Sequence, residues 1–208
     1  MTNRRKSERI FLTAKTRMVA EERASDLNSL LNALTAWYAF ALIAVSIANL
    51  TGTLRHGIIE FSATLLSIAL FGISLFQLGG RISQRAESFR KCYLALKGIY
   101  NSSDSEEEKM AAYERELEKY PNHKPIDYDL MIEGADSRGQ TLWNDEGRIE
   151  FTETIKKRVK RHKTIMGALK TLGILLPPIL FLSAFALSGV EPRGDQPTIV
   201  ETPGASSE

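Results

Sequence analysis

The sequence predicts an all-α membrane protein, and three uncharged runs are the main reason. No residue is charged in 27–54, in 61–80 or in 171–190. An α-helix rises ~1.5 Å per residue and needs about 20 apolar residues to cross a ~30 Å hydrocarbon core. Each run reaches that length. The link 51–57 between the first two runs has room only for a tight return, so we expect a transmembrane helical hairpin.

The remainder of the chain is strongly charged, which hides these runs in whole-chain averages. The 208 residues have a mean hydropathy of −0.16 and a net charge of +2, so the charge balance gives no case for nucleic-acid binding. The single cysteine, Cys92, excludes an internal disulfide. The first apolar run starts too far from the N-terminus, and is too long, for a cleavable signal peptide.

This pattern divides the chain into segments of different character. We expect, in order, a cytoplasmic N-terminal helix (1–33), a transmembrane hairpin (34–79), a cytoplasmic helical region (80–166), a third transmembrane helix (167–190) and a disordered tail (191–208).

The first three helices follow from the absence of breakers. Residues 4–26 contain neither Gly nor Pro, and Ser7 is a suitable N-cap, so a charged helix is expected to run into the first span without a break. The second span covers roughly 58–78. A helix over 81–100 should project from the membrane, because no breaker occurs before Gly98.

Capping signals predict the next elements. After a linker at 101–104, Ser105 and an acidic first turn begin a helix that Pro121 ends. Residues 122–147 are expected to be irregular, and a helix resumes near Ile149. Its basic face consists of Lys156, Lys157, Arg158, Lys160, Arg161 and Lys163.

The third uncharged run contains Pro177 and Pro178, which remove two backbone donors and should kink the helix near Gly173 and Ile174. Membrane helices accept proline more readily than buried soluble helices do. We therefore expect a third span, with a re-entrant or packed segment as the alternative.

Basic residues predict the orientation. They concentrate before the first span, in 81–97 and in 156–163, whereas the hairpin tip has Arg55 and the tail has Arg193. The positive-inside rule then places the N-terminus and 81–165 on the cytoplasmic side of the membrane. The cluster at 156–163 is expected to contact anionic lipid, with nucleic acid as the weaker alternative.

No enzyme signature is present: the chain lacks a nucleotide-binding glycine loop, a nucleophile elbow, an HExxH motif and paired metal cysteines. A metal site could be built from His123, Asp127 and Asp129, but a polar cluster that stabilises a turn is the better interpretation. We expect no catalysis, no metal and no cofactor.

A polar stripe runs along the second span. The spacings of 4, 3, 4, 3 and 3 residues place its members on one helical face. In lipid such a face must meet protein or water. One interpretation is close helix packing. The other is a pore lining completed by several copies, with a hydrophobic constriction at Phe71. The stripe consists of Glu60, Thr64, Ser67, Phe71, Ser74 and Gln77.

Short motifs around the hairpin resemble the SLATT family of two-transmembrane effectors, which are associated with SMODS nucleotidyltransferases and SLOG sensors in bacterial conflict systems. The matching segments are 13–17 (TAKTR), 20–23 (AEER), 120–123 (YPNH) and 127–128 (DY). The resemblance covers roughly residues 8–165. It implies that Asn122, His123, Asp127 and Tyr128 form an interface that couples the cytoplasmic part to the membrane.

The resemblance also implies a function. Such proteins are thought to form membrane pores that kill or arrest an infected cell, and a nearby nucleotidyltransferase, nucleotide sensor or reverse transcriptase is the expected trigger. We therefore expect a homo-oligomeric pore-forming effector of anti-phage defence. The alternative is a non-conducting membrane scaffold that recruits a signalling partner through its cytoplasmic helices.

Overall fold

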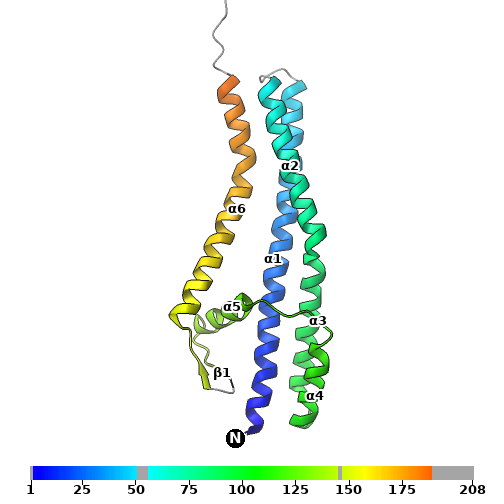
Figure 1. Ribbon diagram of the computed structural model, residues 1–208, viewed down its shortest axis with the longest axis vertical. Coiled ribbons are helices and arrows are strands. Elements are labelled where there is room, and N and C mark those ends of the chain that lie inside the picture. The colour runs from blue at the N-terminus through cyan, green and yellow to red at the C-terminus, as the bar shows by residue number, and fades with distance from the viewer. Residues whose placement is uncertain (1, 51–55, 145–146, 189–208) are drawn as a thin grey trace, which may run out of the picture.

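One helix connects the whole length of the molecule. The computed structural model describes residues 2–50, 56–144 and 147–188, and in it α1 (Thr2–Leu50) runs without interruption from the charged N-terminal segment through the first uncharged run (Figure 1). This confirms the expected continuous helix. Ser7 lies inside α1 rather than at its N-cap, and its hydroxyl donates to Glu106 at 2.6 Å.

The second helix, α2 (His56–Gly80), returns alongside α1 and packs against it through the buried Leu66. Ser62 of α2 is also buried. Most of the expected turn at 51–57 lies outside the described residues. The next helix, α3 (Ile82–Asn101), continues through Gly98. It is separated from α2 by Arg81, whose φ of 44° is left-handed. A side chain in that conformation is strained, and Arg81 interrupts an otherwise continuous helical path from Glu60 to Asn101.

The capping prediction is confirmed for α4 (Glu106–Leu117). The backbone amide of Ser105 donates to Glu108 at 2.9 Å, and the Glu108 amide donates to the Ser105 hydroxyl at 3.3 Å. The helix ends at Leu117, three residues earlier than Pro121 alone suggested, and hydrogen-bonded turns continue to Tyr120.

The expectation that 122–147 is irregular was wrong. This stretch forms α5 (Pro125–Asp136) and the first strand of a hairpin, β1 (Leu142–Asn144), which pairs antiparallel with β2 (Gly147–Ile149). Proline at the start of α5 costs no hydrogen bond. The helix is stable because its apolar residues, including Met131 and Ile132, are buried against Leu12 of α1.

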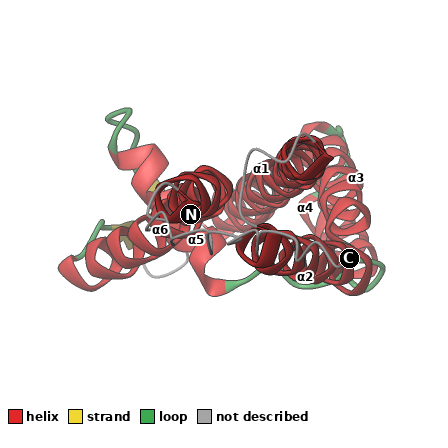
Figure 2. Cartoon of the chain, turned by 90° about the horizontal axis from the view of Figure 1, so that it is seen from above, coloured by secondary structure: helices red, strands yellow, loops and turns green. Residues whose placement is uncertain are grey.

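The last helix, α6 (Glu153–Ser188), begins after the hairpin and not at Ile149. It contains Pro177 and Pro178 and stays helical through both, while Figure 1 shows it changing direction along its length. The view from above shows the long helices standing side by side (Figure 2). The expected tail, 191–208, lies outside the described residues.

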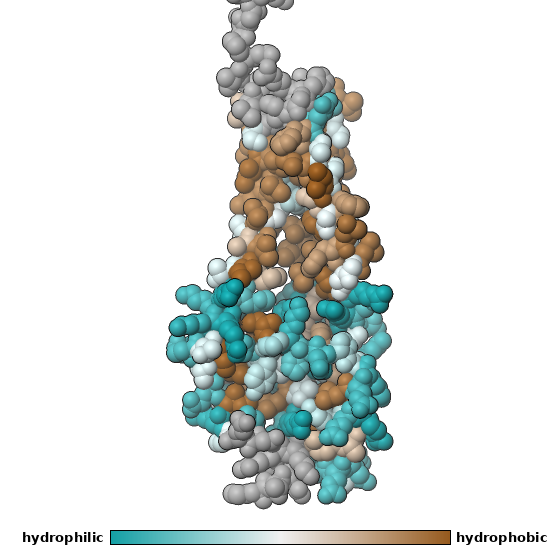
Figure 3. Space-filling view, viewed as in Figure 1, coloured by the Kyte–Doolittle hydropathy of each residue, from teal (hydrophilic) through white to brown (hydrophobic). Residues whose placement is uncertain are grey.

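The surface separates into two halves along the long axis (Figure 3). We call residues 27–50 of α1, α2, and α6 from Thr171 onward the apolar half. The remainder is the polar half. Three described helical stretches are long and apolar enough to cross a membrane: Ser7–Leu50, Glu60–Asn101 and Glu153–Ser183. The predicted all-α fold with three such helices is therefore confirmed.

Candidate functional site

The polar half is joined by a set of buried charged contacts that begins at Arg17 of α1. This side chain is only 1% exposed. It donates to the backbone carbonyl of Pro121 and, at 3.3 Å, to the side-chain oxygen of Asn122. Its guanidinium also lies 5.5 Å from the ring centre of Phe89 on α3. The segment before α5 is thereby fastened to α1 and α3.

Burial makes the Arg17 charge costly, and its pKa is lowered by this desolvation. Within the described residues its Nε is buried without a hydrogen-bond partner. The oxygens of Pro121 and Asn122 compensate part of the cost. A buried arginine held this way fixes the position of the loop, because the carbonyl and the amide must face it.

One turn and a half further along α1, Arg23 forms a two-pronged ion pair with Asp127. The distances are 2.5 Å from Nε to Oδ1 and 3.3 Å from the terminal nitrogen to Oδ2. Asp127 is fully buried, and it also accepts the Lys124 amide at 2.7 Å, which caps the start of α5. One carboxylate therefore begins α5 and attaches it to α1.

Two more ion pairs attach α5 to α6. Asp129, 2% exposed, accepts from Arg158 at 2.8 Å, and Glu133 accepts from Lys163 at 2.7 Å. Together with the Arg23 pair they make a continuous connection from α1 through α5 to α6. We call the set of Arg17, Arg23, Asn122, Asp127, Asp129 and Arg158 the clamp.

The basic residues of α6 fall into a paired group and an exposed group. Arg158 and Lys163 face α5, and Lys156 pairs with Glu153 at 2.8 Å. The other members of the predicted lipid-facing cluster, Lys157, Lys160 and Arg161, are exposed. Contact of this cluster with lipid stays a prediction.

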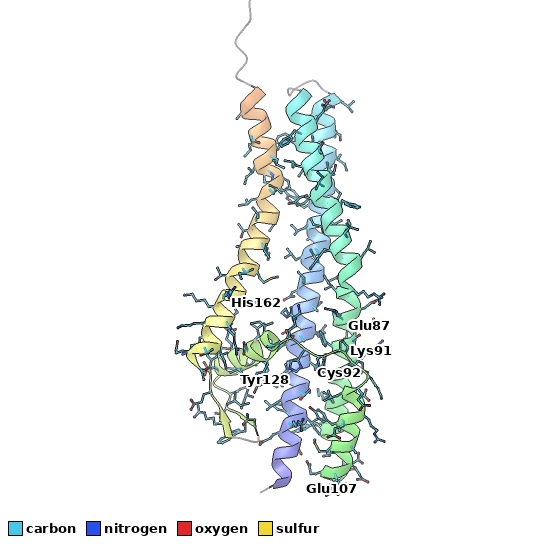
Figure 4. All side chains as sticks on the ribbon, viewed as in Figure 1. Glu87, Lys91, Cys92, Glu107, Tyr128 and His162 are labelled. Atoms are coloured by element: carbon cyan, nitrogen blue, oxygen red, sulfur yellow. The ribbon has the colours of Figure 1, made fainter. Side chains whose placement is uncertain are left out.

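Two histidines flank the clamp. Burial and the nearby Arg17 lower the pKa of His123, and Asp127 opposes them. Burial and Arg23 likewise lower the pKa of His162. Figure 4 shows His162 and Tyr128 on the side of α1 that faces α6, with Cys92 on the opposite side.

The metal site considered for His123, Asp127 and Asp129 gains no support, since both carboxylates bind arginine. In the described ranges no group of three or more His, Cys, Asp or Glu side chains is placed to hold a metal ion. Two residues of the polar cluster expected as the alternative, Asp127 and Asp129, belong to the clamp, and His123 lies beside it.

The polar stripe of α2 is split by the fold. Glu60, Thr64, Ser67 and Phe71 are exposed, and Phe71 is 64% exposed. Ser74 and Gln77 are half-buried, and Gln77 donates to Asn32 of α1 at 3.2 Å. The upper part of the stripe therefore faces away from this chain, whereas its lower end takes part in packing.

Sequence reasoning did not find the contacts that the arginines of the clamp make. The sequence predicted Arg17 and Arg23 only as members of the family motifs. No spacing rule links them to their partners, which lie about a hundred positions later in the chain. A signal for Arg158 was present, because Asp129 is an acidic residue among the apolar residues of α5 and needs a cation if buried.

Most of the chain matches a known protein family. The model of the SMODS and SLOG-associating 2TM effector domain family 5 matches residues 2–183. The match includes all of α1 and α2, the clamp, and the long apolar helix Glu153–Ser183. No curated protein and no solved structure matches the chain.

Proposed function

Because the chain belongs to the SMODS and SLOG-associating 2TM effector domain family 5, we propose that it is the membrane-permeabilising effector of a bacterial anti-phage defence system. Copies assemble in the inner membrane, and the triggered assembly lets ions pass, which arrests or kills the infected cell. The trigger is external to the chain: a nucleotidyltransferase, a nucleotide sensor or a reverse transcriptase encoded nearby.

The outward-facing part of the α2 stripe is the observation that carries this proposal. Glu60, Thr64 and Ser67 are exposed on a helix apolar enough to cross a bilayer. Polar groups at membrane depth face protein or water. The chain's own helices pack on another face of α2, through Leu66. Neighbouring copies can shield the stripe, and a ring of such stripes makes a polar path narrowed by Phe71.

The distribution of charge supports an orientation with the N-terminus in the cytoplasm. The polar half contains the basic clusters of α1, α3 and α6, as the positive-inside rule requires of the cytoplasmic side. A partner made in the cytoplasm then has direct access to α3, α4, α5 and the hairpin.

The clamp gives a route for control. It connects α5 to α1 and α6, and both of these helices continue into the apolar half. A partner that binds the polar half more tightly in one arrangement of these helices shifts the population toward that arrangement. Asn122, His123, Asp127 and Tyr128 act as coupling residues in this mechanism.

The double variant Thr64→Leu with Ser67→Leu tests the pore. Induced expression of the wild-type chain should depolarise cells, as measured with a voltage-sensitive dye, and the double variant should abolish depolarisation at equal membrane abundance. Ser46→Leu is the matched control, since it removes an exposed hydroxyl from α1, bonded there to the Leu42 carbonyl at 2.9 Å. Undiminished depolarisation by the double variant would sink the pore assignment.

The alternative is the non-conducting scaffold. One feature favours it: Trp143 of β1 is 52% exposed and pairs across the hairpin with Arg148, which makes a ready contact for another protein. The scaffold predicts that the reconstituted chain binds its trigger without any ion flux from liposomes, whereas the pore predicts flux on binding.

A further inference from the structure

We propose that the crevice between α1 and α6 in the apolar half is a binding site for an anionic phospholipid. One acyl chain occupies the crevice, and Lys170 holds the phosphate. The crevice has a volume of about 220 Å³ and is called the α1–α6 groove here. Its lining consists of Trp37, Phe40, Ala41, Ala44, Val45, Pro177, Pro178 and Phe181. The inference does not depend on the proposed pore.

The groove exists because the two helices touch just beneath it and then fail to fill the space above. A Cβ on Gly173 would lie 3.2 Å from the side chain of Leu34, so the backbones approach closely there. The Trp37 indole donates to the carbonyl of Ile174 at 3.1 Å. That carbonyl lacks its usual helical donor because Pro178, four residues later, has no N–H.

Above this contact the lining is short or rigid. Ala41 and Ala44 leave space on α1, and the rings of Pro177 and Pro178 cannot reach across it. In a bilayer the surrounding hydrocarbon fills such a space and gains dispersion contacts with its walls.

Size and chemistry both indicate an acyl chain. The lining is apolar and lies on helices long enough to span the membrane. The lining runs from Trp37 to Val45 of α1, about 12 Å along the helix axis, a length that matches a segment of an extended acyl chain. Phe40, 62% exposed, presents its ring to the same bilayer.

Charge indicates where the headgroup lies. Lys170 is exposed and precedes Pro177 by seven residues, two helical turns, so both lie on one stripe of α6, about 10 Å apart along the axis. It is the last charged residue before the uncharged run, where a lysine extends to the phosphate level. Asp26 of α1 lies about 16 Å along the axis below Trp37, whereas Lys170 lies about 6 Å below Ile174, the partner of Trp37. Asp26 is therefore about 10 Å further from the groove than Lys170.

Native mass spectrometry of the full-length, delipidated protein tests the proposal. Titration with phosphatidylglycerol should show one tightly retained lipid per chain, bound more tightly than phosphatidylcholine. Lys170→Gln should weaken retention of phosphatidylglycerol about fivefold and leave phosphatidylcholine nearly unchanged. Ala44→Phe fills the groove and should remove the retained lipid of either kind.

Matched variants separate the site from general effects. Lys97→Gln removes an exposed lysine from α3, outside the basic cluster of α6 that is expected to contact lipid. Gly72→Leu adds bulk at an exposed position of α2 with no neighbouring atoms. Both should retain lipid as the wild type does. Unchanged retention in Ala44→Phe, or an equal loss of retention in Lys97→Gln and Lys170→Gln, overturns the proposal. The proposal is also wrong if Ala44→Phe changes the oligomeric state and leaves lipid retention unchanged. In that case a second copy of the chain occupies the groove.

Discussion

The polar and apolar halves are held together by different kinds of contact. In the polar half, Asp127 and Asp129 are buried carboxylates that join helices through arginines. In the apolar half, the polar contacts between described helices include the Gln77–Asn32 bond at 3.2 Å and the bond from Trp37 to the α6 backbone. The apolar cluster around α1 and α2 supplies the remaining packing there.

The difference follows from the solvent around each half. In water the apolar clusters of the polar half gain free energy by burial, and buried charges then select one arrangement. In lipid, helices gain little from burying apolar surface against each other, so association depends on shape and a few hydrogen bonds. Of the most apolar 18 residues in each stretch, only 6% are buried in α6, against 11% in Glu60–Asn101 and 22% in α1. The membrane part of α6 is therefore the element with most surface available to lipid or neighbours.

Asp127→Ala is expected to have the largest effect on this contrast, since it leaves Arg23 without its carboxylate and removes the cap of α5. We expect the free energy of unfolding of the polar half to fall by about 3 kcal/mol. Hydrogen exchange should show α5 losing protection while α2 keeps it. Equal loss in both halves would contradict the idea that the two are stabilised separately.

Two controls accompany this variant. Asp127→Asn keeps an acceptor for the Lys124 amide but loses the charge, so its effect should be intermediate. Glu87→Ala breaks the exposed pair with Lys91, whose nitrogen and oxygen lie 2.7 Å apart, and should leave stability unchanged because exposed pairs contribute little.

Gly173→Val should have a medium effect, confined to the apolar half. The new side chain meets Leu34 at the close approach of α1 and α6 and should cost about 1–3 kcal/mol of helix association. Spin labels on the two helices in nanodiscs should report a larger separation. Gly167→Val, at an exposed position with open space around it, is the control on the same helix, and an equal displacement there would refute the packing argument.

Acidification should have the smallest effect and act on the polar half. Burial and Arg17 lower the pKa of His123 from its ordinary 6.5, so the folded state prefers the neutral ring and the unfolded state binds the proton more readily. Its contribution is complete above pH 6.5 and decreases as the pH falls below that value. The melting temperature should fall between pH 7.5 and 5.5, and His123→Asn should reduce this dependence. If the melting temperature of His123→Asn falls more steeply with acidification than that of the wild type, the pKa of His123 is not lowered by folding.

Local signals predicted much of the fold. The lengths of the uncharged runs predicted α1, α2 and α6, and the capping residues Ser105 and Glu108 predicted the start of α4. The hairpin and α5 were missed, because α5 has weak periodicity of its own and is stable only through Leu12 of α1. Similarly, Arg81 gave no sign that it separates α2 from α3.

The candidate site was less predictable. The motif residues Asn122 and Asp127 were identified by resemblance, but their arginine partners lie about a hundred residues away in the chain. That the residues of the α2 stripe share one helical face follows from periodicity once the segment is a helix. Which part of the stripe packs and which part is exposed depends on where α1 lies.

Sequence alone therefore determined that this chain has three apolar helices and where charge separates them, because helix length and hydropathy are properties of contiguous residues. Tertiary structure decided which partners the charged side chains contact. The clamp and the α1–α6 groove both depend on side chains from distant segments meeting at a few ångströms. No local pattern encodes such distances, since they result from the packing of whole helices against one another.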